Sequence, residues 1–212
     1  MKPILYGKAE SVYVRAVRLT LIEKGVPYDL VEVDVFARSG VPAEHIRRHP
    51  FGRIPAFKHG EFALYESGAI ARYVDETFAG PVLQPRGTRA RARMNQALSV
   101  LDAYCYRTMV WDIFVEHVRA PSQGWATDQA RVAAAWPRVE TCMVALQDIQ
   151  GDGPYFAGPD ISLADLFAAP IFAYFRQVPE AVRRMGAYTE LVTWWALMEP
   201  RPSMRATRSA LG

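Results

Sequence analysis

The chain has 212 residues, of which 50% are apolar, and a formal net charge of +3 at pH 7. This length allows one large domain or two small ones, with enough apolar side chains to bury a sizeable core. The small charge argues against a nucleic-acid partner. We interpret the arginine-rich run between residues 86 and 93 as the solvated start of a helix.

The sequence predicts neither a membrane segment nor an export signal. The longest apolar stretches, such as residues 166–175, are far shorter than the roughly 20 residues that cross a bilayer. Residues 1–7 run into a strand pattern and lack the basic and apolar regions of a signal peptide. We therefore expect a cytoplasmic protein without a membrane partner.

The first predicted elements are a strand, a helix and a second strand. Residues 4–6 form a short apolar run, and Ser11 then precedes a helical pattern that ends at Gly25. Residues 31–35 alternate valine with acidic side chains, which is typical of a half-buried strand. This order predicts a β-α-β unit with parallel strands.

A hairpin and a further helix are predicted next. Residues 56–58 and 62–65 flank a His-Gly turn, so we expect two short antiparallel strands. Ser67 opens a helical pattern that runs to Thr77. With a less regular helix before the hairpin, the order βαβαββα predicts a thioredoxin-like domain over residues 1–80.

The rest of the chain has purely helical patterns. Residues 81–87 and the preceding Gly80 are rich in proline and glycine, and we interpret 81–87 as a linker. Beyond it, apolar stripes at helical spacing predict an all-helical bundle domain over residues 88–212. Pro137 interrupts one stripe and predicts a kink or a helix start.

The cysteines and histidines do not predict a metal site. Cys105 and Cys142 lack CxxC spacing, and we interpret both as small buried apolar residues. His45 and His49 are four residues apart, a spacing that could chelate a metal, but no third ligand accompanies them. We expect this pair on a solvated helix or turn face.

Three local features could hold a ligand. Ile54-Pro55 stands at the head of a strand, where a cis bond would turn the backbone groups of Ile54 outward to pair with an extended peptide. Glu66-Ser67 heads a helix, where Ser67 can act as a cap and Glu66 can attract an ammonium. Ser11 lies at another helix start, where a hydroxyl and a positive dipole stabilise an anion.

Each feature also has an ordinary structural explanation. An X-Pro pair is usually a trans turn, and a serine at a helix start is usually a cap without a ligand. In the predicted order of elements, however, all three fall at the same edge of one small sheet. That convergence favours a ligand-binding role, with an extended peptide at Ile54 and an amino-acid head group carrying both charges at Glu66-Ser67.

The sequence resembles a known family at these positions. Residues 49–57 read His-Pro-Phe-Gly-Arg-Ile-Pro-Ala-Phe, and residues 65–70 read Tyr-Glu-Ser-Gly-Ala-Ile. In order and spacing, both segments resemble the glutathione-binding core of cytosolic glutathione S-transferases. Residues 4–17, which include Ser11, look most like the serine-type classes and particularly phi.

The C-terminal half resembles the same family. Residues 158–166 are similar to its capping-box motif, in which the side chain of Asp165 reaches back to the N–H of Ser162. Trp194 or Trp195, followed by residues 201–203, is similar to its C-terminal helix ending. The resemblance therefore covers nearly the whole chain.

The resemblance implies roles for individual residues. Ser11 would be the catalytic residue and donate a hydrogen bond to the sulfur of glutathione. Ile54, beside Pro55, would pair with the cysteinyl backbone, while Glu66 and Ser67 would hold the γ-glutamyl end.

The resemblance implies three candidate partners for the glycine carboxylate of glutathione. Arg53 stands where relatives often have Gln or Lys, and its guanidinium can still bind a carboxylate. Arg38 or Ser39 replaces the His-Lys pair that phi-type sequences carry after the second strand.

The resemblance also predicts the partners of the chain. Phe51 stands where many relatives insert an aromatic side chain into a second subunit, so we expect a homodimer. An apolar or aromatic electrophile is expected in a pocket between the domains, lined by Tyr13, Tyr104, Trp111 and Phe114.

The leading hypothesis is a glutathione transferase whose bound thiolate attacks an electrophilic carbon, with glutathione as co-substrate and no metal. A glutathione-dependent peroxidase or isomerase would use the same thiolate. A non-catalytic family member that binds apolar ligands or other proteins is the third possibility.

Overall fold

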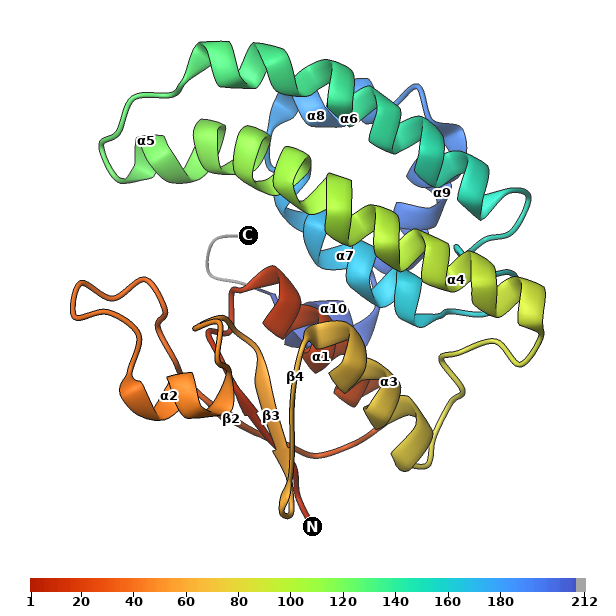
Figure 1. The fold of residues 1–212 in the computed structure, drawn as a ribbon. Helices are drawn as coiled ribbons and strands as arrows, with labels where there is room; N and C mark the ends of the chain where they lie inside the picture. Colours follow the sequence, from red (N-terminus) through yellow and green to blue (C-terminus); the bar gives the residue numbers. More distant parts are fainter. Residues whose placement is uncertain (209–212) are drawn as a thin grey trace. The chain divides into compact units, whose positions relative to one another are not determined.

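The computed structural model describes residues 1–208, which form two compact units (Figure 1). The first unit spans Met1–Val82 and also contains the described residues from Pro202 onward, and the second spans Leu83–Arg201. Among the described residues, no helix is both long and apolar enough to cross a bilayer.

A four-stranded mixed sheet forms the centre of the first unit. Its strands are β1 (Ile4–Tyr6), β2 (Asp29–Val31), β3 (Ala56–His59) and β4 (Phe62–Tyr65), in the order β2-β1-β3-β4. β1 runs parallel to β2 and antiparallel to β3, and β3 pairs with β4 as the predicted hairpin. The thioredoxin-like arrangement is therefore confirmed.

The second strand differs from the prediction. It starts at Asp29 and ends at Val31, whereas the valine alternation predicted residues 31–35. Val33 is nevertheless buried, because it packs with Tyr6 and Ala56 after the chain has left the sheet. The predicted alternation is therefore wrong at Val31, which is 42% exposed, and at Val35, which is only half-buried. The extent of the strand follows its pairing with β1.

Helices α1 (Val12–Glu23), α2 (Ala43–Arg48) and α3 (Ser67–Thr77) complete the sequence βαβαββα. The inner faces of α1 and α3 form one core with Leu5 and Phe57 of the sheet. A buried ion pair joins these helices, since the ammonium of Lys24 lies 3.1 Å from the Asp75 carboxylate and also donates to two carbonyl oxygens.

The short helix α10 (Pro202–Ala206) belongs to the first unit, although the sequence assigned these residues to the helical domain. The hydroxyl of Ser203 donates to the carboxylate of Glu23, and Nε of Arg15 donates to the Thr207 hydroxyl at 3.3 Å. Both contacts attach the segment to α1. The first unit is therefore built from two separate segments of the sequence.

The second unit is all-helical, as predicted. The run α4 (Thr88–Val100), η1 (Leu101–Arg119) and α5 (Ala120–Ser122) is continuous, and η1 is wound as a π-helix. The other helices are α6 (Gln129–Gln150), α7 (Leu163–Phe175), α8 (Pro179–Met185) and α9 (Thr189–Met198). Pro137 lies inside α6, so no helix starts there.

Asp165 anchors this unit. Its fully buried carboxylate accepts hydrogen bonds from the N–H of Ser162 at 2.8 Å, the N–H of Phe156 at 3.1 Å and the indole of Trp194 at 2.9 Å. The predicted capping box at the start of α7 is confirmed. Burial raises the pKa of Asp165, and the hydrogen bonds lower it.

Candidate functional site

The sheet register brings the three predicted features to one edge. Tyr6, the last residue of β1, pairs with Ala56 at the start of β3, and Ala56 pairs with Tyr65 at the end of β4. These three residues form one row across the sheet. The row is followed by Ser11 five residues after Tyr6 and by Glu66 directly after Tyr65, and it is preceded by Pro55 directly before Ala56. The loops that carry these residues therefore leave the same edge of the sheet.

The Ile54-Pro55 bond is cis, as the hypothesis required, and it is the only cis bond in residues 1–208. Pro55 is buried, whereas Ile54 is half-buried and packs against both apolar clusters of the first unit. Within the described chain, the N–H of Ile54 makes no backbone hydrogen bond. It is therefore a candidate donor to a ligand.

Glu66 has an unusual backbone conformation. Its φ of 70° is the only positive value at a non-glycine residue in the described chain. Such conformations cost about 1–3 kcal/mol and cluster at functional sites. The sequence carried no signal for this feature, because glycine is the residue expected at positive φ.

The start of α3 lies one residue earlier than expected. Glu66 occupies the N-cap position and Ser67 is the first helical residue, so the expected capping role of Ser67 is wrong. Ser67 is buried, while the side chain of Glu66 is exposed. The first-turn N–H groups of α3 lack partners within the helix, which makes this end suitable for a carboxylate.

Ser11 is the N-cap residue of α1, with an extended backbone at φ −63° and ψ 133°. Its carbonyl accepts from the N–H of Arg15 at 2.8 Å. Within residues 1–208, its hydroxyl makes no capping hydrogen bond to the helix. The half-buried hydroxyl thus sits at the positive end of α1 without a role in the cap.

The residues expected at the glycine end of the ligand are exposed. Arg38 and Ser39 lie in the loop before α2, next to a turn in which the N–H of Gly40 donates to Ala37. The Arg53 side chain is also exposed. Their exposure leaves all three side chains accessible to a ligand, so each stays a predicted partner of the carboxylate.

The histidine pair is buried, which contradicts the expected solvated face. His45 and His49 are 1% and 2% exposed, and their ring centroids are 6.3 Å apart. Burial lowers the pKa of His49, and the nearby carboxylate of Glu66 acts in the opposite direction. Among the described residues, no group of three potential metal ligands includes the pair.

Aromatic side chains surround the loop after α2. Phe51 is 71% exposed, and its ring meets His49 and Tyr65 edge-on at 6.2 and 6.3 Å between centroids. The His49 and Tyr65 rings are themselves 4.8 Å apart. An exposed phenylalanine that packs on the rings of His49 and Tyr65 is suited to contact another molecule.

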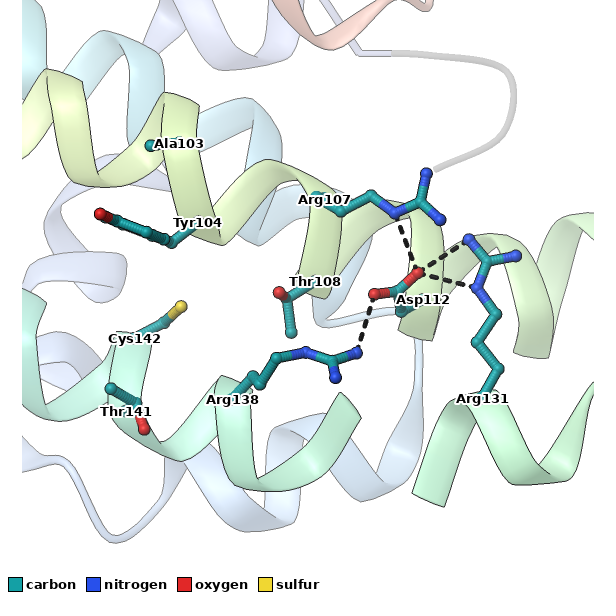
Figure 2. Close-up of a pocket in the computed structure, with 9 residues that line it drawn as sticks. All are labelled: Ala103, Tyr104, Arg107, Thr108, Asp112, Arg131, Arg138, Thr141 and Cys142. Atoms are coloured by element: carbon teal, nitrogen blue, oxygen red, sulfur yellow. Dashed lines mark hydrogen bonds and ion pairs between the residues drawn. The ribbon is translucent and has the colours of Figure 1, made fainter. Parts of the chain in front are cut away.

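The second unit contains a cavity of about 600 Å³ between η1 and α6 (Figure 2). The buried Asp112 carboxylate lies at its wall, with guanidinium nitrogens of Arg131, Arg138 and Arg107 at 2.7, 3.2 and 3.3 Å. Tyr104, one of the predicted pocket aromatics, also lines this cavity and is 63% exposed.

The other predicted pocket aromatics have different surroundings. Phe114 is buried in the helical unit, where its ring lies 4.6 Å from that of Tyr174. Trp111 and Tyr13 are half-buried. Within the second unit, Tyr104 and Phe114 therefore have different neighbours, with Tyr104 near α6 and Phe114 against α7.

A thioredoxin-like unit with a cis-proline before its third strand, combined with an all-helical unit, defines a two-domain fold of glutathione-dependent enzymes. The sequence matches the family descriptions "Glutathione S-transferase, N-terminal domain" over residues 5–82 and "Glutathione S-transferase, C-terminal domain" over residues 129–205. It is 30% identical to "Probable glutathione S-transferase GSTF1" of Oryza sativa subsp. japonica, an alignment that covers 97% of this chain and 95% of the relative. The chain therefore belongs to the glutathione S-transferase family.

Solved structures agree with this assignment. A glutathione S-transferase-I bound with lactoylglutathione is 25% identical, with a TM-score of 0.86 and all of both chains covered. Glutathione S-transferase I from maize, in complex with an atrazine glutathione conjugate, is 26% identical, with a TM-score of 0.84 and 98% and 96% of the two chains covered. The plant relatives of F type confirm the predicted resemblance to the phi class.

Proposed function

We propose that this chain is a glutathione transferase that activates the thiol of glutathione for attack on small, apolar or aromatic electrophiles. The observation that carries the proposal is the row of Tyr6, Ala56 and Tyr65, from which the loops with Ser11, Ile54-Pro55 and Glu66-Ser67 leave one sheet edge. The solved relatives bound to glutathione derivatives support the same ligand class.

In this proposal Ser11 stabilises the thiolate. Lowering an ordinary thiol pKa of about 8.5 by roughly two units requires about 2.7 kcal/mol of selective stabilisation. A hydrogen bond to a charged group contributes about 1.5–3 kcal/mol, and a helix N-terminus contributes about 0.3–1 kcal/mol. The Ser11 hydroxyl at the start of α1 can supply both.

The rest of the tripeptide would be held by backbone and charge. The N–H and C=O of Ile54 would pair with the cysteinyl residue as a neighbouring strand does. The γ-glutamyl carboxylate would accept from the first turn of α3, and Glu66 would pair with its ammonium. Arg53, Arg38 or Ser39 would hold the glycine carboxylate.

The electrophile would be bound by the predicted aromatics, Tyr13, Tyr104, Trp111 and Phe114. The exposure of Tyr104 supports a direct contact with the electrophile, whereas the burial of Phe114 against Tyr174 supports a packing role within the helical unit. The maize relative in complex with an atrazine glutathione conjugate supports an aromatic electrophile. Detoxification of such compounds is the physiological role we propose.

The proposal also covers the oligomeric state and the compartment. The exposed ring of Phe51 supports a homodimer in which this side chain contacts the second subunit. Cys105 and Cys142 are both free thiols, which is consistent with the reducing environment of the cytoplasm.

Ultraviolet difference spectroscopy tests the central claim. At neutral pH the complex with glutathione should show the absorption of a bound thiolate, and Ser11→Ala should abolish it while glutathione still binds. Turnover with a chlorinated aromatic substrate should fall in parallel. Wild-type protein that binds glutathione without this absorption would instead be a non-catalytic family member. Turnover of a hydroperoxide, but not of the chlorinated substrate, in the presence of glutathione would favour the peroxidase.

A further inference from the structure

One of the two buried histidines reaches the segment that would bind glutathione. Nε2 of His45 lies 2.7 Å from the carbonyl oxygen of Arg53, which is the length of a short N–H···O hydrogen bond. His45 projects from α2 and is 1% exposed, so no water competes freely for this contact. The contact joins α2 directly to the residue that precedes Ile54.

The chemistry of the two atoms determines the tautomer of His45. A carbonyl oxygen only accepts hydrogen bonds, so Nε2 must carry the proton and donate. Within residues 1–208, the buried Nδ1 atom has no hydrogen-bond partner, which fits the nitrogen that lacks a proton. The opposite tautomer would place two acceptors 2.7 Å apart.

This hydrogen bond acts on a group of the candidate site. The carbonyl of Arg53 and the N–H of Ile54 belong to the same planar, trans peptide unit, in which the two groups point in opposite directions. Holding the carbonyl toward α2 therefore directs the N–H of Ile54 away from α2. That N–H is the donor assigned to the cysteinyl carbonyl of glutathione.

The loop after α2 passes close enough to make the contact possible. Gly52 has a φ of 61°, and its N–H donates to the carbonyl of His49 at 2.9 Å. A Cβ atom at this position would lie 3.2 Å from Cδ1 of Ile46 on α2. The tight turn thus places the Arg53 carbonyl within reach of an imidazole from the same helix.

We propose that His45 is a positioning residue that orients the Arg53–Ile54 peptide so that the N–H of Ile54 can bind the backbone of glutathione. This inference rests on the proposed glutathione site. It assigns His45 no contact with the ligand, so its effect should fall on the affinity for glutathione and not on the chemical step.

Two substitutions separate the hydrogen bond from mere filling of space. In His45→Gln the amide nitrogen is as many bonds from Cβ as Nε2 of histidine, so it can donate to the same carbonyl. In His45→Asn the amide nitrogen is one bond nearer to the backbone and falls short. The glutamine and asparagine introduced at position 45 are both polar amides, so they differ mainly in reach. Glu44→Gln, on the exposed face of α2, is the control.

Binding is measured by calorimetry with S-methylglutathione, which cannot form a thiolate, and turnover is measured at saturating glutathione. His45→Asn should raise the Kd about tenfold, the scale of one lost oriented hydrogen bond, and leave kcat within about twofold. His45→Gln should restore the Kd to within about threefold of wild type. In spectra of the ¹⁵N-labelled full chain, the ligand-induced shift of the Ile54 amide should be lost only in His45→Asn.

Several results would overturn the inference. Equal Kd values for wild type and a folded His45→Asn would do so, as would a fall in kcat at unchanged Kd. If His45→Asn does not fold, the ¹⁵N spectrum of wild-type His45 decides, since a proton on Nδ1 contradicts the hydrogen bond. Wild-type protein that binds neither glutathione nor its S-methyl derivative would refute the proposed function itself, and the inference with it.

Discussion

Replacement of Asp165 by asparagine tests the hydrogen-bond network that anchors the helical unit. One carboxylate oxygen accepts from the Phe156 N–H and the Trp194 indole, and the other accepts from the N–H and hydroxyl of Ser162. In Asp165→Asn the remaining oxygen can keep the first pair of donors. The new NH₂ group then faces the Ser162 N–H, which loses its acceptor.

The cost follows from this arrangement. A buried donor left without an acceptor costs about 1–3 kcal/mol, and the surviving hydrogen bonds lose their charge assistance. The Ser162 hydroxyl can rotate to accept, so it adds little. We expect a destabilisation of about 2–4 kcal/mol, against a total stability of roughly 5–15 kcal/mol.

Thermal unfolding followed by circular dichroism measures this effect. For a chain of this size, 1 kcal/mol corresponds to roughly 2–4 °C, so Tm should fall by about 5–15 °C. Asp160→Asn, at an exposed position of the same segment, is the control and should change little. A Tm for Asp165→Asn equal to that of the control would show that the carboxylate network does not stabilise the fold.

Three further predictions concern the first unit. Glu66→Gly should raise the free energy of unfolding in urea by up to about 1 kcal/mol, because glycine adopts the φ of 70° without strain. The same change should weaken glutathione binding. An unchanged free energy of unfolding would argue against backbone strain at Glu66. Ser67→Ala should raise the KM for glutathione more than it lowers kcat, and equal losses at saturation would contradict its remote role. Burial lowers the pKa of His49 below its ordinary 6.5. As the pH falls, His49 is therefore protonated in the unfolded chain at a higher pH than in the folded chain. Its contribution to stability should be full above pH 6.5 and decline as the pH falls through the folded value, and unfolding curves of His49→Gln should lack this decline.

Much of the fold could be predicted because it depends on contacts between near neighbours in the chain. The hairpin around His59-Gly60 and the helix of residues 12–23 follow from side-chain periodicity and local turn preferences. The capping box is equally local, since Ser162 and Asp165 are three residues apart. The segments around Pro55 and Ser67 that resemble the family are also short and continuous, so the candidate site could be predicted from them.

Other features depended on partners distant in the sequence. The spacing of His45 and His49 could not reveal their burial, because the carbonyl that His45 contacts lies in a loop whose path is decided by packing on α2. Residues 202–208 were assigned to the helical domain, but contacts with Glu23, Arg15 and Arg18 attach them to α1.

By itself, the sequence determined the types and order of the elements and the residues that could bind a charged tripeptide. The tertiary structure alone decided the row of Tyr6, Ala56 and Tyr65, the positive φ of Glu66 and the orientation of the Arg53–Ile54 peptide. Periodicity and capping act over a few residues, whereas strand register and peptide orientation are set by groups that meet only when the sheet forms.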